Sequence, residues 1–526
     1  MRLVALLLRR HRVALLAWTL SLLALVAATV PAYEATYPGL AARSVIVEQM
    51  RADQGSRVLY GELGADGTYG QLFAWETGTY VLLLVAVAAI LLGIALTRGE
   101  EDAGRVELVR SVGVEPGAPV RAALLVLSGF CVVVGAGTAG ILLAQHDPVE
   151  LSATGAWGFA ALTVVVGWTF GLIAVLSAQL RGDASGARSL AFLVLGMAFA
   201  TRAIADAAAS GRLGWLNWLS PLGWKAVLAP WDGDRTWTLI PMLVVPLGLA
   251  FVVLVTVTRR EVGGALLGGT KGSARRLRVR TVEGWSGVQA RGALLGWTVG
   301  VLGVAVLFGS MAEGLSGTME QDPTMRDLLQ QMGVDLGSPM EAYFSLLGGM
   351  VAVTAMIGAV SLVLRWRGEE VSGRLVHELA VGTPRWRSLL ARAAVAGVAG
   401  VLWLAAGGAA MGVLGRVLLG EGSGDPVGAA LRGTLGEAPG LLAAVGISTL
   451  LCAVAPRVAV LGSWLVVGWC AFVLWFGQLV SLPEPLLEAT VLGHSGALSL
   501  VALGLLAAVT LAAGAALVGR RDLRLG

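Results

Sequence analysis

Residues 77–105 read TGTYVLLLVAVAAILLGIALTRGEEDAGR, an uncharged stretch long enough to cross a lipid bilayer followed by a densely charged loop. The charged part, RGEEDAGR at 98–105, returns as RGEEVSGR at 367–374, again after a long apolar run. One motif repeated in the same setting at an offset of 269 residues indicates a duplicated chain. The sequence therefore predicts two homologous halves, each carrying this acidic loop on the same side of a membrane.

Two further matches support the duplication. RVALLAWT at 12–19 matches RGALLGWT at 291–298, and RRE at 259–261 matches RRD at 520–522. The order of these landmarks is kept while their offsets drift through the loops, as expected of a duplication. The chain then divides into three parts: a first half at 1–263, a basic linker at 264–287 and a second half at 288–526.

The composition predicts an all-α membrane protein. Charged residues make up 14% of the chain and hydrophobic residues 56%, and the mean hydropathy is +0.78, whereas about a quarter of the residues in soluble domains are charged. About twelve apolar runs, six in each half, can cross the bilayer, and they must be helical because an open sheet leaves backbone groups unsatisfied in lipid. The predicted spans are 13–31, 77–97, 119–143, 156–178, 189–209, 238–258, 292–312, 344–364, 389–415, 438–455, 458–480 and 496–518.

The basic residues predict the orientation. Arginines cluster at 9–12 before the first span, at 259–291 around the linker and at 520–524 after the last span, whereas the loops at 146–150 and 481–494 have no Lys or Arg. Because basic loops stay in the cytoplasm, both termini, the linker and the RGEE loops are expected there. The net charge of +4 follows from this topology and requires no nucleic-acid partner.

The residue types that carry catalysis or bind metals show no useful spacing. Cys131, Cys452 and Cys470 all fall within predicted spans, and the four histidines lie on separate loops. The stretch GGALLGGTKG at 263–272 departs from a phosphate-binding loop, because Lys271 follows Thr270 instead of Gly and no strand precedes it. We expect no catalytic site, no metal site and no nucleotide site in this chain.

The RGEE loops predict a short amphipathic helix. Glu100 and Glu101 suit the positive end of a helix, valines follow at helical spacing, and Gly113 stops the segment before a proline. Residues 369–384 repeat this plan. The alternative is a solvated turn between two spans, but retention of the motif in both halves favours the helix.

Here the sequence resembles a known family. Duplicated six-span halves with a Glu-Glu-x-x-Gly-Arg loop after the second span look like the permeases of type-2 ABC exporters. The first half also reads RAIAD at 202–206, WLSPLGW at 218–224 and PWDGDRTW at 230–237. These motifs are similar to those of a double-length group of polyketide-antibiotic exporters, which includes the tetronasin-resistance permease. The resemblance covers nearly the whole chain and implies a multi-pass protein of a bacterial inner membrane.

In such exporters the loop after the second span is a coupling helix that docks on a separate ATP-binding subunit. The resemblance gives this role to Glu100, Glu101, Gly104, Arg105, Glu369, Glu370, Gly373 and Arg374. Two loops per chain imply two ATPase subunits. ATP and Mg are then expected in those partners, so the chain itself needs no cofactor.

The first half carries further candidate residues, and the second half keeps their pattern only in part. We expect the following in the export path or at an outer gate: Arg202, Asp206, Trp218, Ser220, Pro221 and Trp224. Arg202 and Asp206 are spaced for an ion pair on one helix face, and such charges in a span mark either function or a structural tie. The tryptophans suit either an aromatic belt at the membrane interface or a gate that releases product.

The function predicted from these features is the permease subunit of an ATP-driven exporter of hydrophobic or amphipathic compounds such as antibiotics. The alternative is an ion-coupled secondary drug transporter, which needs ionisable residues in several spans, whereas the interior here offers essentially Arg202 and Asp206. A membrane-embedded enzyme needs a catalytic cluster that the pattern does not contain. The long outer loops at 33–71 and 314–342 are expected to cap or gate the path.

Overall fold

The structure is a computed structural model of the chain. It describes residues 2–36, 39, 43–44, 47–48, 50–51, 54–145, 147, 149–207, 213–257, 264, 266, 279–310, 339–419, 424–476, 484–494 and 496–522. Several predictions fall outside these residues: those on the repeat 259–261, on most of the linker and of the stretch 263–272, on most of the second outer loop, and on 477–483.

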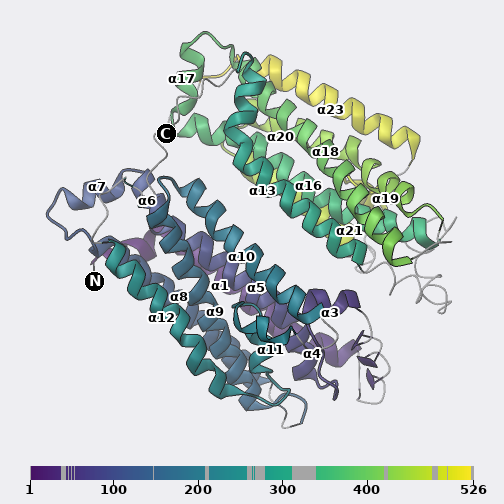
Figure 1. Ribbon diagram of the computed structural model, residues 1–526. Helices are drawn as coiled ribbons and strands as arrows, with labels where there is room; N and C mark the ends of the chain where they lie inside the picture. The colour runs from purple at the N-terminus through teal and green to yellow at the C-terminus, as the bar shows by residue number, and fades with distance from the viewer. Residues whose placement is uncertain are drawn as a thin grey trace. The chain divides into compact units, whose positions relative to one another are not determined.

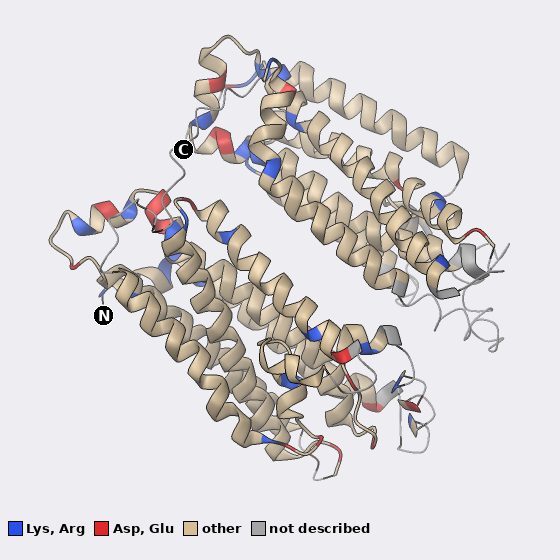
Figure 2. Ribbon diagram, in the orientation of Figure 1, with Lys and Arg blue, Asp and Glu red and all other residues tan. Residues whose placement is uncertain are grey.

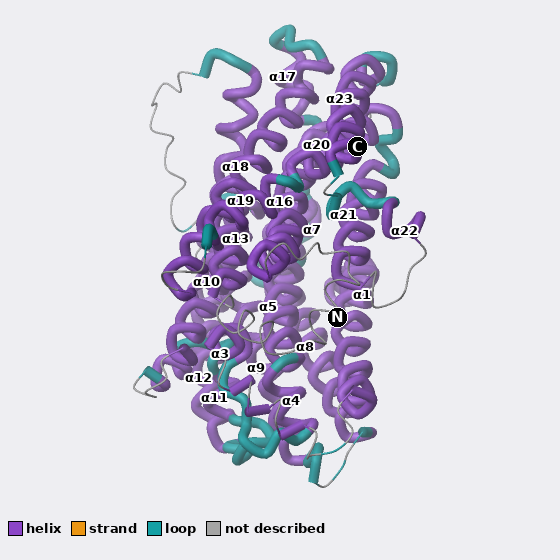
Figure 3. Tube along the Cα trace, turned by 90° about the vertical axis from the view of Figure 1, so that its right-hand side faces the viewer, coloured by secondary structure: helices purple, strands orange, loops and turns teal. Residues whose placement is uncertain are grey.

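Within the described residues the chain is helical and contains no strand (Figure 3). Eleven of the described helical segments are long and apolar enough to cross a membrane, and a shorter apolar segment, Ala459–Leu474, lies where a twelfth span is expected. The predicted all-α membrane fold is therefore confirmed. The contacts divide the chain into two compact units, Met1–Arg275 and Arg276–Gly526.

In the first unit the long helices surround α9 (Figure 1). This helix packs against α5, α8, α10 and α12, and most of its side chains are buried. Local signals start these helices: Ser152 caps α9 by accepting a hydrogen bond from the amide of Gly155, and Pro119 lies in the first turn of α8. The long helices are α1 (Arg2–Thr36), α5 (Thr77–Ala95), α8 (Ala118–Ala144), α9 (Ala153–Leu180), α10 (Ala184–Ala207) and α12 (Leu239–Val257).

In the second unit α16 is the most deeply buried long helix and contacts α13, α18, α19, α20 and α21. Its buried side chains include Val351, Met356 and Val363. The described helices of this unit are α13 (Val282–Ser310), α16 (Pro339–Val371), α17 (Arg374–Ala380), α18 (Arg385–Leu419), α19 (Pro426–Leu435), α20 (Ala438–Val454), α21 (Ala459–Phe476), α22 (Glu484–Glu488) and α23 (Ala497–Val518).

In each unit, charged residues gather at the two ends of the bundle, and the middles of the helices are almost free of charge (Figure 2). We call the end that carries an RGEE loop the loop end.

One boundary differs from expectation, because α1 begins at Arg2 and continues through Arg9 to Arg12, whereas the predicted span begins at residue 13. Arginine is a good helix former, and its stem can lie along apolar surface while its charged group reaches water.

Candidate functional site

The first RGEE loop is a helix–turn–helix step at the end of a span. After α5, the chain forms α6 (Arg98–Asp102) and then α7 (Arg105–Arg110). Gly104 joins the two helices at a φ of 69°, and Gly113 follows α7 at a φ of 84°. A side chain at Gly104 meets no atom within 4 Å, so backbone conformation and not space favours glycine there.

The second loop has the same backbone plan. The span α16 continues through Glu369 and Glu370, and α17 follows after Gly373, whose φ of 73° matches that of Gly104. Gly382 then ends the segment at a φ of 86°. A short helix is therefore present in both units, each time between two left-handed glycines. The acids do not open it as predicted, because they precede Gly104 and Gly373, and Glu369 and Glu370 lie in the last turn of α16.

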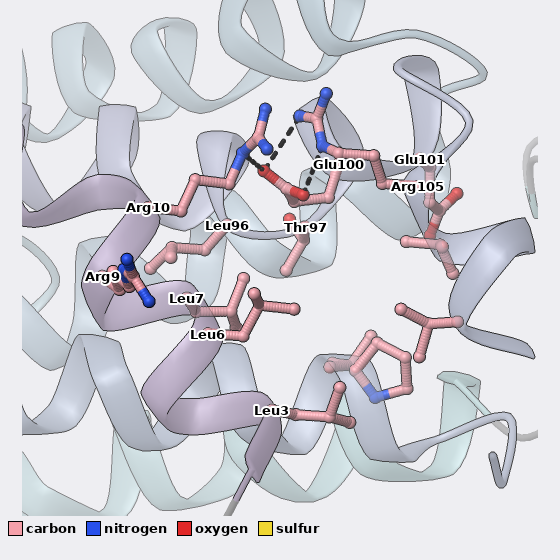
Figure 4. A pocket seen from close by; sticks show the side chains of 14 residues that line it. Leu3, Leu6, Leu7, Arg9, Arg10, Leu96, Thr97, Glu100, Glu101 and Arg105 are labelled. Atoms are coloured by element: carbon pink, nitrogen blue, oxygen red, sulfur yellow. Dashed lines mark hydrogen bonds and ion pairs between the residues drawn. The ribbon is translucent and has the colours of Figure 1, made fainter.

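The acids of the first loop are buried and paired within the chain. Glu100 accepts hydrogen bonds from Arg105 at 2.6 Å and 2.9 Å, and it lies 3.0 Å from Arg10 of α1 (Figure 4). His11 is 3.1 Å from the same carboxylate. Glu101 pairs with Arg98 at 2.8 Å, and Arg98 also donates to the carbonyls of Gly182 and Gly264. These contacts fasten the loop to its own bundle.

The acids of the second loop are also paired, but with other elements. Glu370 is 0% exposed and pairs with Arg367 at 2.9 Å and with Arg521, near the end of the chain, at 2.6 Å. Glu369 pairs with Arg392 of α18 at 2.6 Å. Arg392 is in turn shared with Glu378 of α17, also at 2.6 Å.

Each of the two loops exposes large apolar side chains beside charged ones such as Glu107 and Arg374. Leu108 of α7 is 76% exposed and Val112 is 78% exposed, and in the second loop Val381 is 80% exposed and Val376 of α17 is 40% exposed. Val106 and Val109 face inward and line a pocket. Of the predicted coupling residues, Arg105 is partly exposed and Arg374 exposed, whereas Glu100, Glu101 and Glu370 are buried. Their predicted role in docking stays a prediction.

At the opposite end of the first unit, Arg202 and Asp206 form the expected ion pair, with 2.9 Å between Nε and Oδ2. Arg202 also donates to the carbonyl of Leu59 at 2.7 Å, and Asn217 donates to Asp206 at 2.9 Å. The pair thereby ties α10 to the distant segment at Leu59 and to the segment at Asn217 that follows α10 in the chain. It also lines a small pocket of about 130 Å³, and its role in an export path stays a prediction.

The WLSPLGW stretch forms a compact corner. A 3-10 helix, η1 (Gly214–Trp218), leads through Pro221 to α11 (Trp224–Leu228). Ser220 donates to the carbonyl of Ala198 in α10 at 2.7 Å, and the indole of Trp224 donates to the carbonyl of Trp218 at 2.9 Å. Trp224 is buried while Trp218 is partly exposed, so the motif anchors this segment on α10.

Sequence reasoning missed Lys225, the residue after this motif. Its buried ammonium group donates to the carbonyls of Tyr60, Ala74 and Trp75 at 2.8–3.0 Å and to Thr79 at 2.6 Å. Burial, and then the nearby charge of Arg202, lower the pKa of Lys225, while Asp206 opposes them. A signal was present: only two of the 38 basic residues are lysines, Lys225 and Lys271.

Among the described residues, no group of His, Cys, Asp and Glu side chains is arranged to hold a metal ion. The structure provides one RGEE loop at the end of a span in each unit. At the opposite end of the first unit, the WLSPLGW segment is hydrogen-bonded to α10. With eleven candidate spans in the described residues, these features define a multi-pass α-helical membrane protein.

Comparison with known proteins identifies the family. Over 500 residues the chain is 32% identical to the multidrug efflux system permease protein Rv1217c of Mycobacterium tuberculosis, and the match covers 94% of this chain and 88% of that protein. Residues 284–520 match the family model of the C-terminal domain of the multidrug efflux system permease Rv1217c. The chain belongs to the family of these multidrug efflux permeases.

Proposed function

We propose that this chain is the membrane subunit of an ATP-driven exporter of hydrophobic or amphipathic compounds, as the resemblance to type-2 ABC permeases implies. One observation carries the proposal: each unit ends a span with the same short helix between two left-handed glycines, and each helix segment exposes apolar side chains. The name of the Mycobacterium tuberculosis relative, a multidrug efflux permease, supports export of several compounds.

In this proposal the RGEE loops lie in the cytoplasm, as do both termini, and each loop docks on one ATPase subunit. The docking surface is apolar: Leu108 and Val112 in the first loop, and Val376 and Val381 in the second. The acids do not contact the ATPase in this proposal. Their ion pairs fasten the loop to its bundle, so that movement of the loop is transmitted to its span. ATP and Mg belong to the partner subunits.

The experiment separates docking from folding. The chain is purified alone and together with an ABC ATPase encoded beside its gene, and ATP hydrolysis, co-purification and export of an amphipathic dye are measured. Leu108→Asp with Val112→Asp, and Val376→Asp with Val381→Asp, should each weaken co-purification and export. Val149→Asp is the matched control, because Val149 is 73% exposed in the loop that follows α8 at its other end.

Two results would overturn the proposal. Appreciable ATP hydrolysis by the chain alone would place the energy source in this chain. Export that continues without the ATPase and stops when an ionophore removes the ion gradient would favour the secondary drug transporter.

A further inference from the structure

A pocket of about 330 Å³ lies at the loop end of the first unit, between α1, the first RGEE loop and the start of α8. Its volume is in the range of small-molecule sites, about 300–1,000 Å³. Leu3, Leu6 and Leu7 of α1 line one side (Figure 4). Val106 and Val109 of α7 also line the pocket. The body of the pocket is therefore apolar.

The rim of the pocket is positively charged. Positions 3, 6, 7 and 10 share one face of α1, so Arg10 continues the apolar row of leucines to the rim. Arg10 is 46% exposed, and its ion pair among the described residues is with Glu100. Arg9 also lines the pocket and has no ion pair among the described residues. The charged residues that line the pocket are three arginines and two glutamates, so the rim has an excess of positive charge: Arg9, Arg10, Arg105, Glu100 and Glu101.

The position of the pocket points to the membrane surface. Leu96 follows α5 directly, and Val120 lies in the first turn of α8, so the pocket lies at the ends of spans where the charged residues gather (Figure 2). Leu6 and Val13 of α1 are more than half exposed, as expected for side chains that face lipid. At this level a bilayer presents phosphate groups with acyl chains directly behind them.

We propose that this pocket binds one anionic phospholipid from the surrounding leaflet. The phosphate lies between Arg9 and Arg10, and the start of an acyl chain enters between the α1 leucines and the α7 valines. The ligand and Glu100 then compete for Arg10, so anionic lipid loosens one of the contacts that fasten the first RGEE loop. The second unit offers a contrast, because the hollow beside its loop is lined by Arg280, Arg365, Glu369 and Arg374 and has no leucine wall.

Binding is measured on the purified full chain, without an ATPase, so the result is independent of the proposed energy source. The chain is reconstituted with phosphatidylglycerol or phosphatidylcholine of the same acyl chains, and the lipid retained after delipidation is titrated. Phosphatidylglycerol should bind more tightly. Replacing Arg9 and Arg10 by Gln should weaken its binding about 25-fold, at about five-fold for each arginine near a phosphate. Arg2→Gln with Arg12→Gln removes the same charge from the same helix outside the pocket and should change the binding little.

Two further variants test the body of the pocket and the competition. Val106→Trp fills the cavity without a change of charge and should abolish binding, whereas Leu108→Trp on the exposed side of α7 should not. Glu100→Gln releases Arg10 and should strengthen binding of phosphatidylglycerol. Monodispersity of each variant reports folding. Equal retention of the two lipids, or unchanged binding in Val106→Trp, would overturn the proposal; a preference for an uncharged amphipathic dye would identify the pocket as a cargo site instead.

Discussion

The two copies of the RGEE loop share a backbone but differ in what holds their acids. Glu100 of the first copy is held by α1 and by its own loop, beside an apolar pocket. Glu369 and Glu370 of the second copy are held by α18 and by Arg521. The hollow beside that loop is larger, about 850 Å³, and is lined by charged groups together with Val279, Val282 and Trp285. A duplicated motif thus preserves the turn geometry, while each unit supplies its own counter-charges.

The difference has an energetic side. The arginines that hold Glu370 have side chains only 15% and 16% exposed, whereas Arg105 and Arg10 at Glu100 are 36% and 46% exposed. Exposed ion pairs contribute little to stability, and loss of one partner from a buried pair leaves an uncompensated charge. The stability of the second loop should therefore depend on Glu370 more strongly than the stability of the first loop depends on Glu100.

The largest expected effect is that of Glu370→Gln, which leaves Arg367 and Arg521 without their shared carboxylate. We expect a loss of about 3 kcal/mol in the free energy of unfolding, seen as a fall of roughly 6 to 12 °C in the thermal midpoint of the purified chain. Glu100→Gln, the matched change, should cost about 1 kcal/mol. Equal losses for the two variants would mean that the two loops are held equally firmly.

A smaller effect, equal in the two loops, is expected at the left-handed glycines. Gly104→Ala and Gly373→Ala should each cost about 1 kcal/mol, because alanine resists a positive φ and neither site limits space. Gly368→Ala, in the helical part of α16 with open space around it, is the control and should be neutral or stabilising. Unequal thermal shifts for Gly104→Ala and Gly373→Ala would contradict the shared backbone plan.

The smallest effect is a dependence on pH, which we test at Glu378 of the second loop. Burial alone would raise the pKa of Glu378, but the hydrogen bonds and charge of Arg392 outweigh it, so the pKa is lowered. A carboxyl with a lowered pKa stabilises the folded chain above its unfolded pKa of about 4.3, and this contribution is lost as the pH falls through the folded value. Glu378→Gln should flatten the acid side of the stability profile, and a profile as steep as that of the unaltered chain would contradict this prediction.

The fold could be predicted from the sequence because lipid allows few solutions. An uncharged run of about 20 residues must form a helix in a bilayer, and the described helices follow those runs closely. The closing glycines, Gly113 and Gly382, could likewise be predicted as helix stops, whereas the left-handed turns at Gly104 and Gly373 were not predicted. Local chemistry decides both features.

The direction in which the acids point could not be predicted. His11 is 89 positions from Glu100, and Arg521 is 151 positions from Glu370, so their pairing depends on the packed bundle. The environment of Lys225 was more difficult to predict. Three of its four acceptors are backbone carbonyls, which every residue type carries, so no sequence pattern indicates them. Only the scarcity of lysine marked it.

That scarcity makes Lys225 a natural chemical reporter. Amine-acylating reagents pass over arginine, and the chain offers them Lys225, Lys271 and the terminal amine. The amine of Lys225 is buried and surrounded by four hydrogen-bond acceptors, so it cannot react while α11 is packed in its observed position. Its rate of acylation therefore measures how often this segment leaves its place against α4 (Tyr69–Trp75) and α5, without any engineered label.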